Sequence, residues 1–306
     1  MSKVDLLVIG GSGFVGAHLV KMATAADYRV AYTYANHKVV LPAQAYQVKI
    51  EEMGVLEACV TDTQPQIIVY CAVPPSQGES AIHHTVNVEG VHRVLASLSP
   101  ATHQTLFVYL STNAIFSGRQ GPYRENDMPD PEARRDVYRT YALTRCEGES
   151  AALSNWSNTL VVRTATVNGR DIQGKLNARL AMPVERLLAG HPLPRFCDRY
   201  ISPTLIDNLV EALLEIIGLD FAYRGILHLA GSQRVTDYEY ACYLAQHLGI
   251  DASLIEKDYM ADSPLLVNGP RDGSLDTTLT QSLLRTRLLR VEEQLAFTFP
   301  ETAISG

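Results

Sequence analysis

Residues 10–16 constrain this 306-residue chain more than any other stretch of its sequence. Three glycines, Gly10, Gly13 and Gly16, recur there at every third position. Residues 4–10 (VDLLVIG) form the uninterrupted apolar run of a buried parallel strand, and residues 14–25 have the apolar spacing of a helix. A glycine-rich turn that joins a first strand to a first helix is typical of a βαβ unit.

Strand-like and helix-like segments continue to alternate after this unit. Further strands are predicted at residues 28–34, 66–72, 106–111 and 159–164, and helices at residues 81–98 and 138–153. This alternation predicts an α/β fold with a parallel sheet. Because βαβ crossovers are right-handed, few topologies remain other than a Rossmann-type doubly wound parallel sheet.

The glycine pattern is suited to binding the pyrophosphate of a dinucleotide. Gly10 permits the tight turn, Gly13 lets the backbone approach the phosphates, and Gly16 lets the helix pack close to the strand. The helix N-terminus presents free N–H groups and the positive end of its dipole. We therefore expect an NAD(P) site, with a turn that binds no ligand as the less favoured alternative. Its residues are Gly10, Gly11, Ser12, Gly13, Phe14, Val15 and Gly16.

The end of the second predicted strand indicates which dinucleotide binds. NAD enzymes place an acid there to bind the ribose 2′-OH. This chain instead has Tyr34, followed by His37 and Lys38, and no acid. We therefore expect NADP(H) to be favoured over NAD(H), although charged residues at such a position also occur on solvated loops without a ligand.

Beyond residue 164 the alternation becomes less regular. Helices are predicted at residues 176–189, 206–217 and 236–248, a strand at residues 225–230, and no clear period at residues 191–203. Thr236, with Glu239 three residues later, is a candidate helix cap. We expect an NAD(P)-binding domain at residues 1–165 and a smaller substrate lobe at residues 166–306, with residues 204–230 returning to the first domain.

Composition excludes several classes of protein. A formal charge of −7 and a pI near 5.7 argue against a nucleic-acid partner. No apolar run reaches the length of a membrane span, and no signal-peptide pattern begins the chain, so we expect a cytoplasmic protein. The five cysteines form no CxxC pair, and the nine histidines no HExxH motif, so no metal site is predicted. His83 and His84 are adjacent and are expected to be ordinary helix residues.

Three later segments resemble a known family. They are NVEG at residues 87–90, STNAIFSG at residues 111–118 and YALTR at residues 141–145. The series resembles the extended short-chain dehydrogenase/reductases, and within them the dTDP-4-dehydrorhamnose reductase group. The segments GPYREND at residues 121–127, SPTLIDNL at residues 202–209 and RDGSLD at residues 271–276 match the same group in order.

The resemblance implies reduction of a keto group by NAD(P)H, most plausibly the 4-keto group of a nucleotide-activated deoxysugar. It assigns the acid/base to Tyr141 and the hydroxyl that polarises the carbonyl to Thr112. It implies further cofactor contacts from Cys71, Ala72, Val73 and Asn87, and substrate contacts from Thr112, Asn113, Tyr141, Thr166 and Arg199. Arg199 is either a pyrophosphate partner or a surface arginine.

The fourth position after Tyr141 departs from the family, which has a lysine where this chain has Arg145. The i, i+4 spacing places both residues on one helix face. Arginine keeps the positive charge, but its head is larger and planar, so the exchange is not conservative. Either Arg145 takes over the ribose contact of the lysine, or the chain is a non-catalytic NADP-binding regulatory protein that resembles the methionine adenosyltransferase β subunit.

A second departure concerns the substrate. Reductases of this group often have an aromatic residue near Thr166 and a tyrosine at the position of Asn168. These departures affect the expected deoxysugar more than the expected cofactor. The helices predicted at residues 81–98 and 138–153 are candidates to pair across the two-fold axis of a homodimer.

Overall fold

The structure is a computed structural model that describes residues 3–74, 79–98, 104–218, 220–262 and 269–300. The chain divides into two compact units. The sheet unit comprises Met1–Ile115, Val137–Arg163 and Val210–Leu227. The second unit comprises Phe116–Asp136, Thr164–Leu209 and His228–Gly306.

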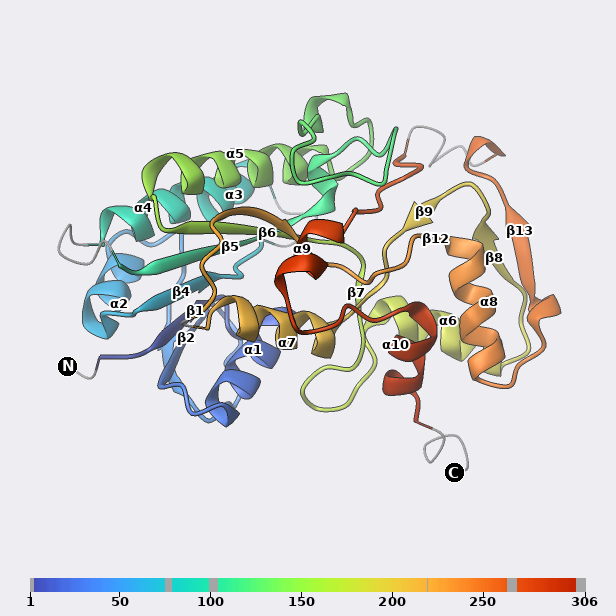
Figure 1. Ribbon diagram of the computed structural model, residues 1–306, viewed down its shortest axis with the longest axis horizontal. Helices are drawn as coiled ribbons and strands as arrows, with labels where there is room; N and C mark the ends of the chain where they lie inside the picture. Colours follow the sequence, from blue (N-terminus) through green and yellow to red (C-terminus); the bar gives the residue numbers. More distant parts are fainter. Residues whose placement is uncertain (1–2, 75–78, 99–103, 219, 263–268, 301–306) are drawn as a thin grey trace. The chain divides into compact units, whose positions relative to one another are not determined.

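Seven strands form the central sheet, in the order β11-β6-β5-β4-β1-β2-β3 (Figure 1). Their bounds are β1 Leu6–Ile9, β2 Val30–Tyr34, β3 Gln44–Gln47, β4 Ile67–Tyr70, β5 Leu106–Thr112, β6 Thr159–Thr164 and β11 Gly225–His228. The pairs β1–β2, β1–β4, β2–β3 and β4–β5 are parallel. The strand order reverses between β1 and β4, which is where doubly wound sheets bind their ligands. The predicted Rossmann-type sheet is therefore confirmed.

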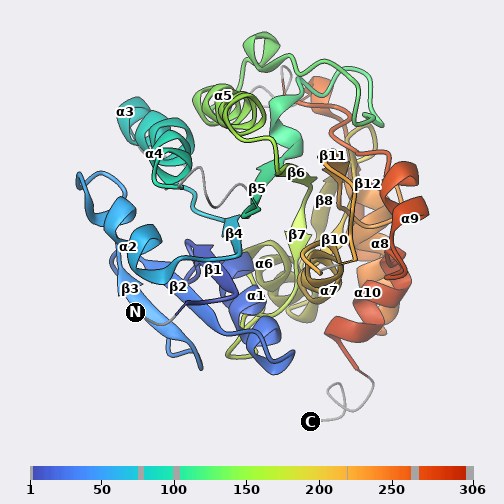
Figure 2. The same ribbon diagram turned by 60° about the vertical axis from the view of Figure 1, so that its left-hand side comes forward.

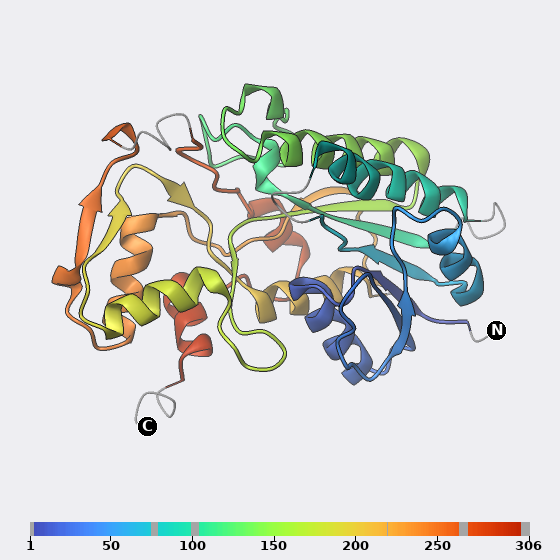
Figure 3. The ribbon, with the colours of Figure 1, turned by 180° about the vertical axis from the view of Figure 1, so that it is seen from behind.

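Helices cover both faces of this sheet. Figures 2 and 3 show α1 (Phe14–Ala25) and α7 (Ile206–Ile216) on one face, with α4 (Gly90–Ala96) and α5 (Arg139–Asn155) on the other. The helix α2 (Val55–Thr63) packs beside α4. Side chains alternate along each strand, and both faces are buried, so the strands read as continuous apolar runs.

One large core lies between the sheet and the helices α2, α4 and α5. Strand residues such as Leu7, Ile68 and Phe107 are fully buried there, and they pack with Leu56 of α2 and Val94 of α4. In the register of the sheet Leu7 pairs with Ile68 and Ile68 pairs with Phe107, so these side chains point to the same face. The packing fixes the height at which each strand ends, and therefore the positions of the loops that carry the site.

The segment before α5 is a helix of three parts. It begins as α3 (Ser80–His84), passes through a π-helical turn (Thr85–Glu89) and continues as α4. The sequence predicts an uninterrupted helix here, and it does not reveal the wider turn. Single π-helical turns within α-helices often occur at functional sites. This one carries Asn87.

The second unit has its own core. The strand β8 (Leu193–Phe196) pairs in parallel with β13 (Ile255–Asp258), and the helices α6 (Ala178–Leu188), α8 (Asp237–His247) and α10 (Val291–Thr298) pack around them. The shorter elements are β7 Val167–Asn168, β9 Tyr200–Ile201, β10 Thr204–Leu205, β12 Val235–Thr236 and α9 Thr278–Leu283. Among the described residues of this unit, 3₁₀ turns cover Pro131–Ala133, Ala252–Leu254 and Met260–Asp262, whereas the turn at Asn113–Ile115 belongs to the sheet unit.

The predicted cap of α8 is confirmed. The Thr236 hydroxyl accepts a hydrogen bond from the backbone N–H of Glu239, and the Glu239 carboxylate accepts one from the backbone N–H of Thr236. Among the described residues, no helix is long and apolar enough to span a membrane. The same residues contain no group of three or more His, Cys, Asp and Glu side chains placed to hold a metal ion.

Candidate functional site

The glycine-rich turn between β1 and α1 leaves no room for side chains. Gly10 has a φ of +81°, and a Cβ there would lie 2.7 Å from the backbone of Ala72. A Cβ on Gly16 would lie 2.4 Å from the carbonyl oxygen of Gly10. Real Cβ atoms do not approach this closely, so the turn requires glycine at both positions. The backbone N–H of Gly10 donates to the Thr33 hydroxyl at 2.9 Å, which fixes the turn to β2.

The helix α1 begins immediately after this turn with its first N–H groups uncapped. Gly13 is the N-cap residue, and no side chain caps the helix. A Cβ on Gly13 would meet only the carbonyl oxygen of Gly10, at 3.3 Å. An uncapped helix N-terminus behind a glycine turn can bind a phosphate group. These features of the chain fit the pyrophosphate of a dinucleotide.

Two neighbouring strand ends border this turn. At the end of β2, Tyr34 is half-buried, and His37 and Lys38 are exposed. At the end of β4, Cys71 and Ala72 are buried, whereas Val73 is exposed. Burial raises the pKa of the Cys71 thiol to about 12, so this group stays protonated. The predicted cofactor residues therefore lie on adjacent strands of one unit.

Arg145 is buried within the sheet unit, with 2% of its surface exposed. Its guanidinium lies over the ring of Tyr109, with Cζ 4.4 Å from the ring centroid. Nη1 donates to Asn87 Oδ1 at 3.2 Å and to the Ala72 carbonyl at 3.4 Å. Nε is buried and has no hydrogen-bond partner among the described residues.

The charge on Arg145 is maintained in spite of its burial. Burial alone would lower the pKa of Arg145, but Tyr109, Tyr141, Tyr70 and Glu149 together raise it. The guanidinium is therefore a permanent cation beside the tyrosines.

Asn87 connects Arg145 to the rest of helix α5. Its Oδ1 accepts from Arg145, and its Nδ2 donates to the Thr144 hydroxyl at 2.9 Å. Asn87 is completely buried. The π-helical turn thus places one amide where it fixes the orientation of Arg145.

Thr112 and Tyr141, the predicted catalytic pair, belong to elements that pack together in the sheet unit. Thr112 ends β5, Tyr141 lies in the first turn of α5, and α5 packs against β5 and the adjoining 3₁₀ turn. Both side chains are half-buried. The Thr112 hydroxyl accepts from the backbone N–H of Ala114 at 3.1 Å and lies 3.4 Å from Asn113 Oδ1.

A buried ion pair anchors this part of the sheet. Arg163 of β6 donates to both carboxylate oxygens of Glu149, with Nη2 2.8 Å from Oε2. The Ser111 hydroxyl, which precedes Thr112 on β5, also donates to Glu149. Charge-assisted bonds of this kind are strong when both partners are fully satisfied. They hold α5 in register with the strand ends.

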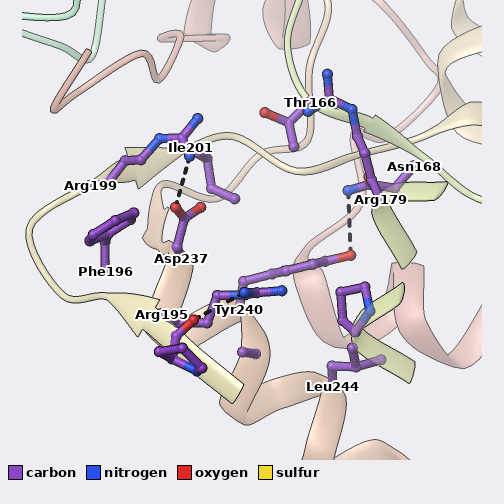
Figure 4. Close-up of a pocket in the computed structure, with 13 residues that line it drawn as sticks. Thr166, Asn168, Arg179, Arg195, Phe196, Arg199, Ile201, Asp237, Tyr240 and Leu244 are labelled. Atoms are coloured by element: carbon purple, nitrogen blue, oxygen red, sulfur yellow. Dashed lines mark hydrogen bonds and ion pairs between the residues drawn. The ribbon is translucent and has the colours of Figure 1, made fainter. Parts of the chain in front are cut away.

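The two other predicted substrate residues, Thr166 and Arg199, line a pocket within the second unit (Figure 4). Its volume is about 270 Å³. The Arg199 guanidinium lies 3.2 Å from the Asp237 carboxylate, and the Asn168 amide donates to Tyr240 at 3.4 Å. Thr166 has a φ of +44°, a strained conformation for a β-branched residue and one that is often found at functional sites.

Positive charge predominates in this pocket. Arg179, Arg195 and Arg199 all line it, with Asp237 as their carboxylate neighbour. Burial raises the pKa of Asp237, although the three arginines partly offset this effect. Burial also lowers the pKa of Arg195, whose Nη1 donates to the backbone carbonyl of Pro194. Such a pocket suits an anionic ligand.

Several residues around the site are not predicted from the sequence. Tyr109, Thr144 and Glu149 contribute to the surroundings of Arg145. His83 lies on helix α3, as expected, and its ring is buried against Tyr141. Glu149 follows Arg145 by four residues on α5, a spacing that indicates a shared helix face. The sequence gives no comparable signal for Tyr109, which comes from a distant strand.

The family model described as RmlD substrate binding domain matches residues 4–303. The chain belongs to this RmlD family. A probable low-salt glycan biosynthesis reductase, Agl14 of Haloferax volcanii, is 24% identical over 297 residues, which cover 94% of this chain and 95% of that protein. The methionine adenosyltransferase 2 subunit beta of Pongo abelii is 26% identical over 250 residues, covering 78% and 70% respectively.

Solved structures share the RmlD-type fold. A dTDP-4-dehydrorhamnose reductase from Bacillus anthracis, in complex with NADP, has a TM-score of 0.79 at 17% identity and covers 98% of this chain and 99% of that one. MoeE5 in complex with UDP-glucuronic acid and NAD has a TM-score of 0.75 at 19% identity, with coverage of 95% and 96%. These neighbours bind either NADP or NAD. The predicted family is confirmed, whereas the predicted roles of individual residues stay predictions.

Proposed function

We propose that this RmlD-family chain reduces the 4-keto group of a nucleotide-activated deoxysugar with NAD(P)H. One observation carries the proposal: Arg145, a buried cation, follows Tyr141 by four residues on the same face of α5, in the unit that also holds the glycine turn and Thr112. Arg145 thereby retains the positive charge of the family lysine on a larger, planar group. A bound NAD(P)H would supply the hydride to the carbonyl carbon.

The residues of the chain then act on the carbonyl oxygen. Thr112 donates a hydrogen bond to this oxygen and polarises the carbonyl. Tyr141 gives its phenolic proton to the same oxygen as negative charge develops there. The guanidinium of Arg145 stabilises the phenolate that remains, and Asn87 holds the guanidinium in place.

We further propose that the pocket of the second unit binds the diphosphate of the substrate. Arg195 and Arg199 present planar guanidinium groups, which match phosphate oxygens. A diphosphate would offset the excess positive charge of this pocket. This assignment supports a nucleotide-linked substrate over a free sugar.

NADP(H) is the proposed cofactor in preference to NAD(H). Support comes from the exposed His37 and Lys38 and from the absence of an acid at the end of β2. A carboxylate there would repel the 2′-phosphate, whereas a lysine attracts it.

The experiment compares wild-type protein with the Tyr141→Phe variant, which lacks only the phenolic hydroxyl. With NADPH and a panel of dTDP- and UDP-4-keto sugars, we expect wild-type turnover and a loss of about hundredfold or more in the variant. Binding of NADPH to the two proteins should agree within about twofold. If the protein binds NADPH tightly but no sugar in the panel causes its oxidation, the reductase proposal is refuted.

A non-catalytic regulatory protein is the second candidate. It is favoured by the hydrogen bonds through which Arg145 is engaged with Asn87 and Ala72, and by the similarity to the methionine adenosyltransferase 2 subunit beta. In that case the cofactor site would serve binding alone. Tyr141→Phe would then leave the biological role intact, and a loss of this role in the variant would count against it.

A further inference from the structure

His83 and His84 are neighbours on α3 with opposite environments. The His84 side chain is about half exposed and lies 3.3 Å from Glu89 and 3.8 Å from Glu147. His83 has only 2% of its surface exposed. Its ring packs edge-to-face against Tyr141, with the ring centroids 6.1 Å apart and the planes at 70°. Because this geometry is preferred by aromatic pairs, His83 contributes to the orientation of the Tyr141 ring.

An imidazole is an unexpected group to bury at this point. The Nδ1 of His83 is buried, and no described residue forms a hydrogen bond with it. Buried polar atoms are nearly always hydrogen-bonded, and a phenylalanine would make the same ring contact without an unpaired nitrogen. Burial also lowers the pKa of His83, so that the ring is neutral near neutral pH. The ring contact with Tyr141 therefore does not by itself explain why an imidazole is buried here.

The groups around this ring pair offer His83 no compensating negative charge. Tyr141 and Arg145 come from α5, and Arg145 is permanently positive. Glu149 of the same helix is paired with Arg163. Among the described residues, no carboxylate forms an ion pair with His83. A proton on His83 would thus add a second positive charge near Tyr141.

We propose that His83 is a positioning residue for Tyr141, and that its imidazole must be neutral for the oxidised cofactor to bind well. This inference rests on the proposed function, in which Tyr141 acts on the same carbonyl group that receives the hydride of the nicotinamide. The oxidised nicotinamide ring carries a positive charge that the reduced ring lacks. A protonated His83 in contact with Tyr141 would therefore repel the oxidised cofactor more strongly than the reduced one.

The test is the ratio of the NADP⁺ and NADPH dissociation constants, measured in the full chain at about pH 7.5 and about pH 5. The 2′-phosphate and the residues that contact it are common to both cofactors, so their titration cancels in this ratio. In wild-type protein we expect the ratio to rise about fivefold on acidification. In His83→Phe, which keeps the ring but cannot be protonated, the ratio should stay within about twofold.

Two further variants sharpen the result. His84→Phe removes the exposed neighbouring imidazole and should reproduce the wild-type rise. His83→Gln is neutral and polar, should give the flat ratio of His83→Phe, and serves as the test if His83→Phe does not fold. A flat ratio in wild-type protein, or an equal rise in wild type and His83→Phe, would overturn the role proposed for His83 and leave the proposed function unaffected. Failure of wild-type protein to bind either cofactor would overturn the proposed function, and this inference with it.

Discussion

At the scale of single residues, the chemistry proposed for the sheet unit depends on Arg145. A lysine at this position would have one ammonium group in place of a planar fork. Nη1 of Arg145 donates to both Asn87 Oδ1 and the Ala72 carbonyl, while the guanidinium lies over the Tyr109 ring. These contacts hold the planar guanidinium in a buried position.

Substitution of Arg145 tests whether turnover depends on the charge or on the shape of this side chain. We expect Arg145→Lys to keep turnover within about tenfold, because the positive charge remains. Arg145→Met should lose about hundredfold in turnover, and its free energy of unfolding should fall by about 1–3 kcal/mol, because Asn87 Oδ1 is left unpaired. Steady-state rates and urea unfolding measure these effects. Activity that appears only in the Arg145→Lys protein would favour the non-catalytic candidate.

Lys38 tests the preference between cofactors. We expect Lys38→Ala to raise the dissociation constant of NADPH about tenfold and to leave that of NADH within about twofold, because only NADPH carries the 2′-phosphate. Lys21→Ala removes another exposed lysine of the sheet unit, from α1, and is the matched control. Equal losses for NADPH and NADH, or no loss for either, would show that Lys38 does not recognise the 2′-phosphate.

At the scale of elements, the turn between β1 and α1 contains one glycine that the fold requires, Gly16, and one that we propose for cofactor binding, Gly13. A Cβ on Gly16 would collide with the backbone of Gly10 and Gly11, whereas a Cβ on Gly13 would make only one tight contact. We expect Gly16→Ala to lower the free energy of unfolding by about 1–3 kcal/mol. Gly13→Ala should cost less than about 1 kcal/mol, yet weaken NADPH binding at least about tenfold.

Thermal unfolding without cofactor and titration with NADPH separate these two effects. Gly16→Ala is expected to be the less stable protein, and Gly13→Ala the weaker binder among well-folded variants. Unimpaired NADPH binding by Gly13→Ala would mean that the pyrophosphate of the cofactor does not approach the protein backbone at this residue.

The sequence predicts the buried strands of the sheet better than its exposed edge. The strands β1, β4 and β5 are buried on both faces, so continuous apolar runs mark them. The edge strand β3 has the sequence QAYQ and no fully buried residue, so no pattern distinguishes it from a loop. The helix α2 is also not predicted, since it has only nine residues.

The sequence likewise predicts only part of the candidate site. The motifs identify Tyr141, Thr112 and the glycine turn, because each lies at a predictable strand end or helix start. The partners of Arg145 are not predictable, because Asn87 lies 58 residues and Ala72 73 residues away along the chain. Such contacts depend on how α5 packs against the sheet and on the π-helical turn, and neither has a local sequence signature.

At the scale of the whole molecule, the chain crosses repeatedly between two units that have separate cores. The proposed cofactor and acid/base residues lie in the sheet unit, and the proposed diphosphate pocket lies in the second unit. The homodimer expected from the sequence stays a prediction, which light scattering on the purified chain would test. The reductase proposal requires both units to serve one reaction.

The transfer of deuterium tests this central claim most directly. NADPH that carries deuterium at the transferred position is mixed with the full chain and a dTDP- or UDP-4-keto sugar, and the product is analysed by mass spectrometry. We predict one deuterium on the new carbinol carbon for each NADPH oxidised, and none when Tyr141→Phe replaces the wild-type protein on the same timescale. Binding of the deuterated NADPH without any transfer to the sugars would contradict the account.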